Sequence, residues 1–579
     1  MTDNQTVTRF ELLPNEILIQ CFQHLDALQI FSSFDQLNSR FNELIRCIPL
    51  HLHFRNYPHS LCQRFCDEML RNPSMRESIH SLHLSNKDEG MWIEFFLEMF
   101  AFETFPSLQS LTLIDAYHFN HSALLQMLWS VPSLQCFHLK DSNIDLNEIF
   151  SQVRRFPIRT LTLPRLSRYV TLLQYFVPLT SLTIETCNRY QLLQVLNAIH
   201  TLKYLQINNL SREAEESDRY DLEKFTHSLQ HLVINNSHYR FNDIEMIIVH
   251  TPDLRRLTLF VDFQFNWFSS DEWNHWFHTY LPRLQIFKFC FRFHRSKYPS
   301  NVEEDLTAFQ NSLQPYIRHH SIECFLSSCR GMIYTVPYAF STFKFHAGMR
   351  RFHHTTIDGE NTFGRVRQLK ICTNEVERYD YHHYRRFSHR EPRRSPFNEE
   401  YIFEPLRPDD IQCIIENFSH VKHLDVSKFS RQQNPSVLME ILRRTPHVTS
   451  LTMTSDTLIS SLENTELRQY LQRMIRKLTI TNSLYSSYEN NIQWQLCVVF
   501  TNLQQLTCTF REERYVTYFL THLPKLIRAQ FTVTEWNQSS QALSLYASLR
   551  QSGMYIHMEY SENRPEQITC WINRETTDN

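Results

Sequence analysis

The sequence predicts an α/β fold in which short parallel strands, backed by helices, stack as a solenoid that follows a small all-α module. Three observations predict it: a short apolar motif that returns along the chain, prolines just before many of its copies, and amphipathic stretches between them. The composition fits a folded chain, because 42% of the 579 residues are hydrophobic and 21% are charged, unlike disordered segments.

A six-residue motif recurs with apolar residues at its first, fourth and sixth places, and Leu108–Leu113, which reads LQSLTL, is the clearest copy. Copies in the first run start 21 to 30 residues apart, and copies from Val421 onward start 23 to 28 residues apart. The alternation is that of a short strand, and the spacing matches the period of leucine-rich repeats. Copies start at Ile79, Leu108, Leu134, Ile158, Leu179, Leu202, Leu229, Leu254, Leu284, Val366, Val421, Val448, Ile475, Leu503 and Leu526.

The stretches between copies are amphipathic, as in 122–129, where Leu124, Leu125 and Leu128 recur at helical spacing. Proline disfavours continuation of a helix, so prolines just before the motif mark the change from helix to strand. Over residues 79–300 and 405–560 the chain resembles the leucine-rich-repeat arcs of F-box proteins, in the ribonuclease-inhibitor-like style, with degenerate copies. These prolines are Pro106, Pro132, Pro157, Pro178, Pro252, Pro282, Pro446 and Pro524.

Threonine is frequent at the fifth place of the motif, which is expected to face the concave side of the sheet. Its preference for strands explains many of these residues without any function. A second interpretation is a protein-binding surface, in which the hydroxyl-rich row is flanked by residues at the third place. The candidate substrate-binding residues are Thr112, His138, Thr183, Tyr204, His231, Arg256, Thr258 and Lys288.

Two amphipathic helical stretches precede the repeats, and Pro14 suits the first turn of the first one. About 40 residues cannot bury all this apolar surface, so a partner or the adjoining repeats must cover the remainder. The apolar residues at helical spacing are Ile17, Leu18, Cys21, Phe22 and Leu25, then Phe34, Leu37, Phe41 and Leu44.

The segment 13–41 resembles an F-box through its Leu-Pro-x-Glu start at Leu13 and through Asn38–Phe41, although Phe41 stands where the family most often has Trp. The resemblance implies binding to a Skp-type adaptor and through it to a cullin, with an unknown protein substrate held by the repeats. Apolar helix residues are core by default, so contact and core both stay open for each residue. The contact set it implies is Leu13, Pro14, Ile17, Leu18, Phe22, Leu25, Leu37 and Phe41.

The expected organisation follows the motif along the chain, and whether the two runs of repeats form one arc or two stays open. The irregular middle segment is aromatic and basic. The predicted parts are a flexible tail (1–9), the F-box-like module (10–50), linking helices (51–78), repeats (79–300), degenerate repeats with an aromatic and basic insertion (301–404), further repeats (405–560) and a C-terminal tail (561–579).

Two other functions stay open beside that of a ligase receptor. The chain could be a protein-binding scaffold not linked to ubiquitylation, with the first helices as a cap of the repeats. The arginines of 385–394, mixed with aromatic residues, could contact RNA, whereas a solvated loop with a chance Ser395-Pro396 phosphorylation motif is the simpler interpretation.

No catalytic, cofactor-binding or metal site is predicted. The six glycines form no phosphate-binding loop. Adjacent histidines, as at 319–320, cannot easily bind one metal together, and Cys62 and Cys66 lack a second cysteine pair at zinc spacing. We therefore expect a non-catalytic protein.

With a net charge of −3, nucleic-acid binding would need a local basic patch. The chain has no apolar run of the length that a membrane span needs, and because residues 1–9 are polar we do not expect secretion. We expect a cytoplasmic or nuclear protein with reduced cysteines.

Overall fold

The structure, a computed structural model, divides into two compact units: residues 1–261 with 275–287, and residues 262–274 with 288–579. The predicted helix at 122–129 and the basic segment 385–394 lie outside the described residues. The described residues are 10–54, 57, 59–86, 92–116, 130–140, 157–166, 178–211, 228–237, 241–263, 270–294, 309, 311, 313, 316, 321–326, 330–352, 362–373, 406–418, 420–429, 434–483, 489–510, 514–533, 554–561 and 564–572.

The first unit begins with short helices whose starts are fixed by side-chain caps. The Asp26 carboxylate accepts a hydrogen bond from the Gln29 amide in a capping box, and the Asn38 side chain accepts one from the Phe41 amide. The elements are η1 (Phe10–Leu12), α1 (Asn15–Phe22), α2 (Ala27–Phe34), α3 (Ser39–Cys47), β1 (Leu50–His53), α4 (His59–Arg71) and α5 (Pro73–Glu77).

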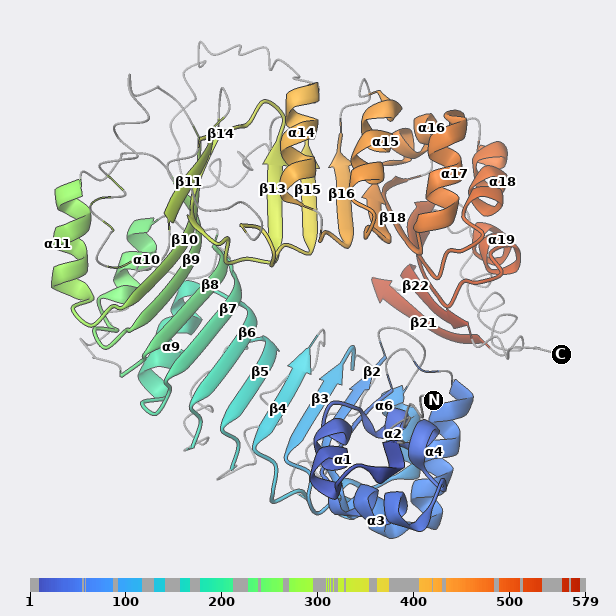
Figure 1. The fold of residues 1–579 in the computed structure, drawn as a ribbon. Helices are drawn as coiled ribbons and strands as arrows, with labels where there is room; N and C mark the ends of the chain where they lie inside the picture. Colours follow the sequence, from blue (N-terminus) through green and yellow to red (C-terminus); the bar gives the residue numbers. More distant parts are fainter. Residues whose placement is uncertain are drawn as a thin grey trace, which may run out of the picture. The chain divides into compact units, whose positions relative to one another are not determined.

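Nine strands of the first unit follow one another in chain order across the sheet, β1 to β9, and each pairs in parallel with the next (Figure 1). Helices α6 (Trp92–Met99), α9 (Arg189–Ala198), α10 (Phe241–Ile248) and α11 (Ser270–Tyr280) lie between strands in sequence, as does η2 (Phe102–Thr104). The strands after β1 are β2 (Ile79–Ser85), β3 (Ser110–Ile114), β4 (Cys136–Lys140), β5 (Thr160–Arg165), β6 (Ser181–Cys187), β7 (Tyr204–Leu210), β8 (His231–Ser237) and β9 (Arg256–Phe263).

The register of these strands confirms the sequence motif. Residues at the fourth place pair with one another from strand to strand, and every one of them is buried. Burying the fourth and sixth places on one face is what stacks the repeats, because each buried aliphatic side chain contributes about 1.5–3 kcal/mol. The fourth-place row is Leu82, Leu111, Phe137, Leu161, Leu182, Leu205, Leu232 and Leu257.

The linking segment at 51–78 contains a strand as well as the expected helices. Strand β1 pairs in parallel with β2, and Leu52 aligns with the fourth-place Leu82. The motif was missed here because Pro49 stands at its first place, where the recognised copies carry Leu, Ile or Val.

The second unit contains an antiparallel group and a parallel sheet. Strand β10 (Ile286–His294) continues from the first unit and pairs with β12 (Arg330–Val336), then β11 (Ser321–Leu326) and β14 (Arg350–Phe352). These three strands are antiparallel, so the expectation of degenerate repeats was wrong for them. The parallel strands are β13 (Thr342–His346), β15 (Gln368–Cys372), β16 (His423–Lys428), β17 (Ser450–Met453), β18 (Lys477–Ser483), β19 (Gln505–Phe510) and β20 (Arg528–Val533).

Strand β13 is a repeat that the sequence motif missed, because its copy at Phe340–Phe345 carries phenylalanine at all three apolar places. The last strands also differ from expectation. Strands β21 (Met554–Ser561) and β22 (Arg564–Ile572) form an antiparallel pair on β20, so a segment predicted to be a tail is part of the sheet. Helices α14 (Pro408–Asn417), α15 (Pro435–Arg444), α16 (Ser455–Glu463), α17 (Thr465–Met474), α18 (Glu489–Val499) and α19 (Arg514–His522) lie on one side of the parallel strands (Figure 1).

A cluster of aromatic rings joins the antiparallel group to the parallel sheet within the second unit. The Phe343 ring lies 5.6 Å from Phe325 of β11, 5.1 Å from Phe363 and 4.9 Å from Phe418, between ring centroids. All four side chains are buried. Such pairs contribute about 0.5–1.5 kcal/mol each beyond the area they bury.

None of the helices in the described part of the chain combines the length and apolar character needed to cross a bilayer.

We expect Phe343→Ala to lower the free energy of unfolding by about 3–5 kcal/mol, because it removes a buried ring with several ring partners. Phe343→Leu, which keeps apolar volume, should cost only about 1 kcal/mol. Denaturant unfolding followed by circular dichroism measures both values, and equal effects of the two variants would contradict a role for the ring contacts.

Candidate functional site

The N-terminal helices expose several large apolar side chains. Leu12 is 74% exposed, Leu37 59%, Ile17 41% and Phe10 38%. In a module this small they are the apolar surface that its own core leaves uncovered, and exposed apolar groups of this kind mark interaction surfaces. Leu12 and Phe10 were not among the predicted contact residues because they precede the Leu-Pro motif.

The predicted contact set divides by burial. Pro14, Ile17 and Leu37 are exposed, and Leu13 and Leu25 are half-buried. Leu18, Phe22 and Phe41 are at most 1% exposed. They form the core of the module, so the prediction that they contact a partner was wrong. The rings of Phe22 and Phe41 pack together with Phe34, with centroids 5.0–6.1 Å apart.

Arg40 holds the exposed segment in place. Its guanidinium donates hydrogen bonds to the Leu13 carbonyl at 2.6 Å, to the Glu11 carbonyl and to the Asn15 side chain at 2.6 and 2.9 Å. Hydrogen bonds from a charged group are stronger than neutral ones. The Arg40 side chain of α3 therefore orders the segment on either side of Pro14.

The module is joined to the first repeat strand through Asp26. Its carboxylate accepts a hydrogen bond from the Tyr57 hydroxyl at 2.5 Å and lies 3.8 Å from His53 Nε2 on β1. Burial and this carboxylate raise the pKa of Tyr57 well above its ordinary value, so the hydroxyl stays a donor. The Phe31 ring also lies 5.2 Å from Phe65 on α4. The helices of the module thus contact the first strand of the sheet and the helix that follows it.

The strand pairing brings most of the predicted substrate-binding residues of the first unit into two rows. The fifth-place row contains Thr112, His138, Thr183 and Thr258. The third-place row contains Tyr204, His231 and Arg256 on adjacent strands. All seven are half-buried except Arg256, which is exposed, whereas Lys288 belongs to the second unit.

Short contacts order these rows. His138 Nδ1 lies 2.7 Å from the Thr162 hydroxyl oxygen, and burial lowers the pKa of His138, as does Lys140. The Tyr204 ring meets the His231 ring edge-on at 4.8 Å, and its hydroxyl donates to the Gln206 side chain at 2.7 Å.

An amide ladder continues from Gln206, and the sequence motif did not reveal it. The Gln206 and Asn235 amides both donate to the Asn208 side-chain oxygen, at 2.8 and 2.7 Å, and the Asn236 amide donates to Asn209 at 3.1 Å. These asparagines lie just after the hexamer, at places where only pairing between strands shows that they meet.

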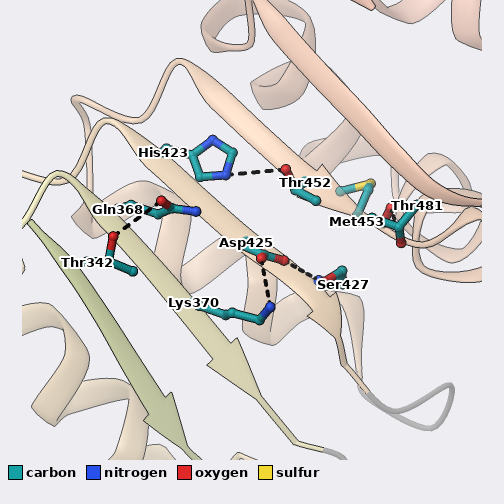
Figure 2. A network of polar contacts seen from close by, with 9 residues as sticks. All are labelled: Thr342, Gln368, Lys370, His423, Asp425, Ser427, Thr452, Met453 and Thr481. Carbon is teal, nitrogen blue, oxygen red and sulfur yellow. Dashed lines mark hydrogen bonds and ion pairs between the residues drawn. The ribbon is translucent and has the colours of Figure 1, made fainter. Parts of the chain in front are cut away.

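The second unit has its own polar network on the strand face (Figure 2). Lys370 Nζ lies 3.5 Å from the Asp425 carboxylate, which also accepts a hydrogen bond from the Ser427 amide at 2.9 Å. His423 Nδ1 lies 2.7 Å from the Ser450 hydroxyl oxygen and its Nε2 lies 3.3 Å from that of Thr452. The residues are held by neighbouring repeats rather than by one motif.

Cys62 and Cys66 are buried on α4, and burial raises the pKa of the Cys66 thiol to about 12. A thiol with so high a pKa is a poor nucleophile and metal ligand. Within the described part of the chain, no three His, Cys, Asp or Glu side chains are grouped to hold a metal. The paired histidines at 319–320, 353–354 and 382–383 lie outside the described residues.

No protein-family model and no curated protein matches the chain. Among solved structures, the yeast Rad7–Elc1 complex is similar at 10% identity and a TM-score of 0.26, over 77% of this chain and 82% of that one. A leucine-rich-repeat protein of Leptospira interrogans is similar at 12% and 0.21, over 79% and 97%. The TLR13–ssRNA13 complex is similar at 12% and 0.21, over 78% and 61%.

Arg40→Met should lower the free energy of unfolding by about 1.5–3 kcal/mol through the lost charged hydrogen bonds. It should also speed proteolytic cleavage near Leu12, because the carbonyls of residues 11 and 13 lose their donor. Limited proteolysis with mass spectrometry measures this, and Arg46→Met, an exposed arginine of the same helix, is the control. Equal cleavage rates would contradict the anchoring role.

Burial lowers the pKa of His423 below its ordinary value of 6.5; Asp425 opposes this shift and Lys477 adds to it. Unfolded His423 therefore takes up a proton more readily, so its contribution to stability is present above about pH 6.5 and is lost as pH falls through the lowered pKa. His423→Asn should weaken this loss of stability on acidification. Denaturation midpoints from about pH 5 to about pH 7.5 test this, with the exposed His447→Asn as control.

Proposed function

We propose that this protein is a non-catalytic receptor in which the N-terminal module binds a Skp-type adaptor of a cullin–RING ubiquitin ligase and the leucine-rich repeats bind a protein substrate. The observation that carries the proposal is the exposed apolar surface of Leu12, Ile17 and Leu37 on a module that resembles an F-box. Its own core is complete without these side chains, so they are available to a partner.

The repeats support the second half of the proposal. The half-buried rows of hydroxyl, imidazole and amide groups on the first unit offer many hydrogen-bonding groups on a rigid sheet. Protein interfaces combine such polar groups with aromatic residues, and Tyr204 beside His231 provides an aromatic element.

A repeat scaffold without a link to ubiquitylation is the second candidate, and one observation favours it. The module contacts β1 and α4 through Asp26 and Phe31, as a cap of the sheet would. Deleting residues 1–50 would expose the end of the sheet whether the module is a cap or an adaptor-binding module, because its helices and β1 support each other. Only substitutions of exposed side chains separate the two functions.

We expect the triple variant Leu12→Asp, Ile17→Asp and Leu37→Asp to bind a purified Skp-type adaptor at least about tenfold more weakly than the wild type, because charges replace the apolar contacts. Isothermal titration calorimetry measures the affinity. The matched control is Leu70→Asp, since Leu70 is an exposed leucine (46%) on α4.

Wild-type affinity of the triple variant would show that the adaptor does not use this surface. If the wild-type protein binds no adaptor and both variants stay folded by circular dichroism, the scaffold function is favoured instead.

A further inference from the structure

The parallel strands of the second unit carry an excess of cations. Strands β13 and β15 to β20, all of whose residues the structure describes, contain five lysines and arginines but a single carboxylate, Asp425. Strands β1 to β8 of the first unit contain Lys140 and Arg165 against Glu185. The five cations are Lys344, Lys370, Lys428, Lys477 and Arg528.

The one carboxylate does not neutralise this surface. Asp425 is 8% exposed and is already engaged by Lys370 and the Ser427 amide. Lys370 is the cation of these strands with which it forms an ion pair, and these strands carry no second acid.

Further cations line the edge where these strands begin. The second-place residues are linked by backbone hydrogen bonds: Lys422 N to Arg367 O at 2.9 Å, Thr449 N to Lys422 O at 3.1 Å, and Arg476 N to Thr449 O at 2.9 Å. Arg367, Lys422 and Arg476 are all exposed, as is Arg365 beside them. We define Arg365, Arg367, Lys422 and Arg476 as the basic edge.

The basic edge is not neutralised internally. None of the ion pairs among the described residues involves Arg365, Lys422 or Arg476. The Arg367 guanidinium donates only to backbone carbonyls of its own turn, at 2.8 Å to Gly364 and 3.4 Å to Val366. Like charges on adjacent strands repel, and an anionic partner would relieve that cost.

The helix dipole explains other cations of this unit but not these. Arg443 and Arg444 lie in the last turn of α15, where a cation stabilises the helix end, and each also pairs with a glutamate. Lys422 lies beyond the last turn of α14. Since the dipole effect falls off within one turn, another role is left for Lys422.

We propose that the basic edge and the adjoining strand face bind an acidic segment of a protein partner. Lys422 and Arg476 lie two strands apart, which is about 9.6 Å in a sheet. An extended chain in the polyproline II conformation has three residues per turn and a repeat of about 9.3 Å, so a peptide with a carboxylate at every third residue places its charges on one face at this spacing.

A protein segment fits this surface better than single-stranded nucleic acid does. Binding of single strands combines cations with aromatic side chains on which bases stack. At the second, third and fifth places of β13 and β15 to β20, His423 is the only aromatic side chain. The inference extends the proposed function and rests on the repeats being a protein-binding surface.

Fluorescence anisotropy with the full chain tests the proposal. The probe is a fluorescein-labelled peptide with glutamate at every third residue in a serine–glycine background, and the same peptide with glutamine is the control. The triple variant Arg367→Gln, Lys422→Gln and Arg476→Gln should raise the Kd by about tenfold. The Kd should also rise with salt between about 0.05 and about 0.2 M NaCl.

The matched control variant is Arg444→Gln, Arg468→Gln and Arg473→Gln, which removes three exposed cations from helices α15 and α17 of the same unit. It should change the Kd by less than about twofold. An equal loss with this control, equal binding of the glutamine peptide, or tighter binding of an oligouridylate RNA would each overturn the proposal.

The adaptor-binding measurement separates this inference from the proposed function. The arginine and lysine variant should bind a Skp-type adaptor as the wild type does, because the module is unchanged. Loss of peptide binding with retained adaptor binding supports the proposal that the basic edge binds an acidic segment. An absence of acidic-peptide binding by the wild type contradicts that proposal and leaves the proposed adaptor binding unaffected.

Discussion

Pairing of parallel strands in one register is the constraint on which both units depend. A slip of one residue would turn side chains such as Leu182, Leu205 and Leu232 from the core to the opposite face of the sheet. The apolar row is buried along its whole length, so such a slip would expose several leucines at once. A repeat is therefore stable only where its strand pairs with its neighbours in this register.

The same register also builds the surfaces. Once the fourth and sixth places are buried, the second, third and fifth places of successive strands must stand in rows. In the first unit the third and fifth places bring together hydroxyl, imidazole and amide groups, with the Tyr204–His231 contact among them. In the second unit the same places bring Lys370 to Asp425 and His423 to Thr452 (Figure 2). One scaffold thus presents two different chemistries.

The N-terminal helices pack against the first repeat and also expose apolar side chains. Asp26 caps α2 and also accepts the Tyr57 hydroxyl, so one carboxylate joins the module to the first repeat. Arg40 donates to the Leu13 carbonyl before Pro14 and to the Asn15 side chain after it. A cap built in this way leaves Leu12 and Leu37 exposed without loss of its core, which is why capping and docking are compatible.

The sequence by itself determined the repeating strand and its register, because the alternation of apolar places and the prolines before them are local properties of the chain. It could not reveal β1 or β13, whose copies carry proline (Pro49) and phenylalanine (Phe340) at the first apolar place. It also could not separate core from contact in the module, since Phe41 and Leu37 share one apolar pattern but are 1% and 59% exposed. The tertiary structure alone decided which polar residues meet, as in the pairing of Asn208 with Asn235 and of Lys370 with Asp425, because each pair joins residues from different repeats.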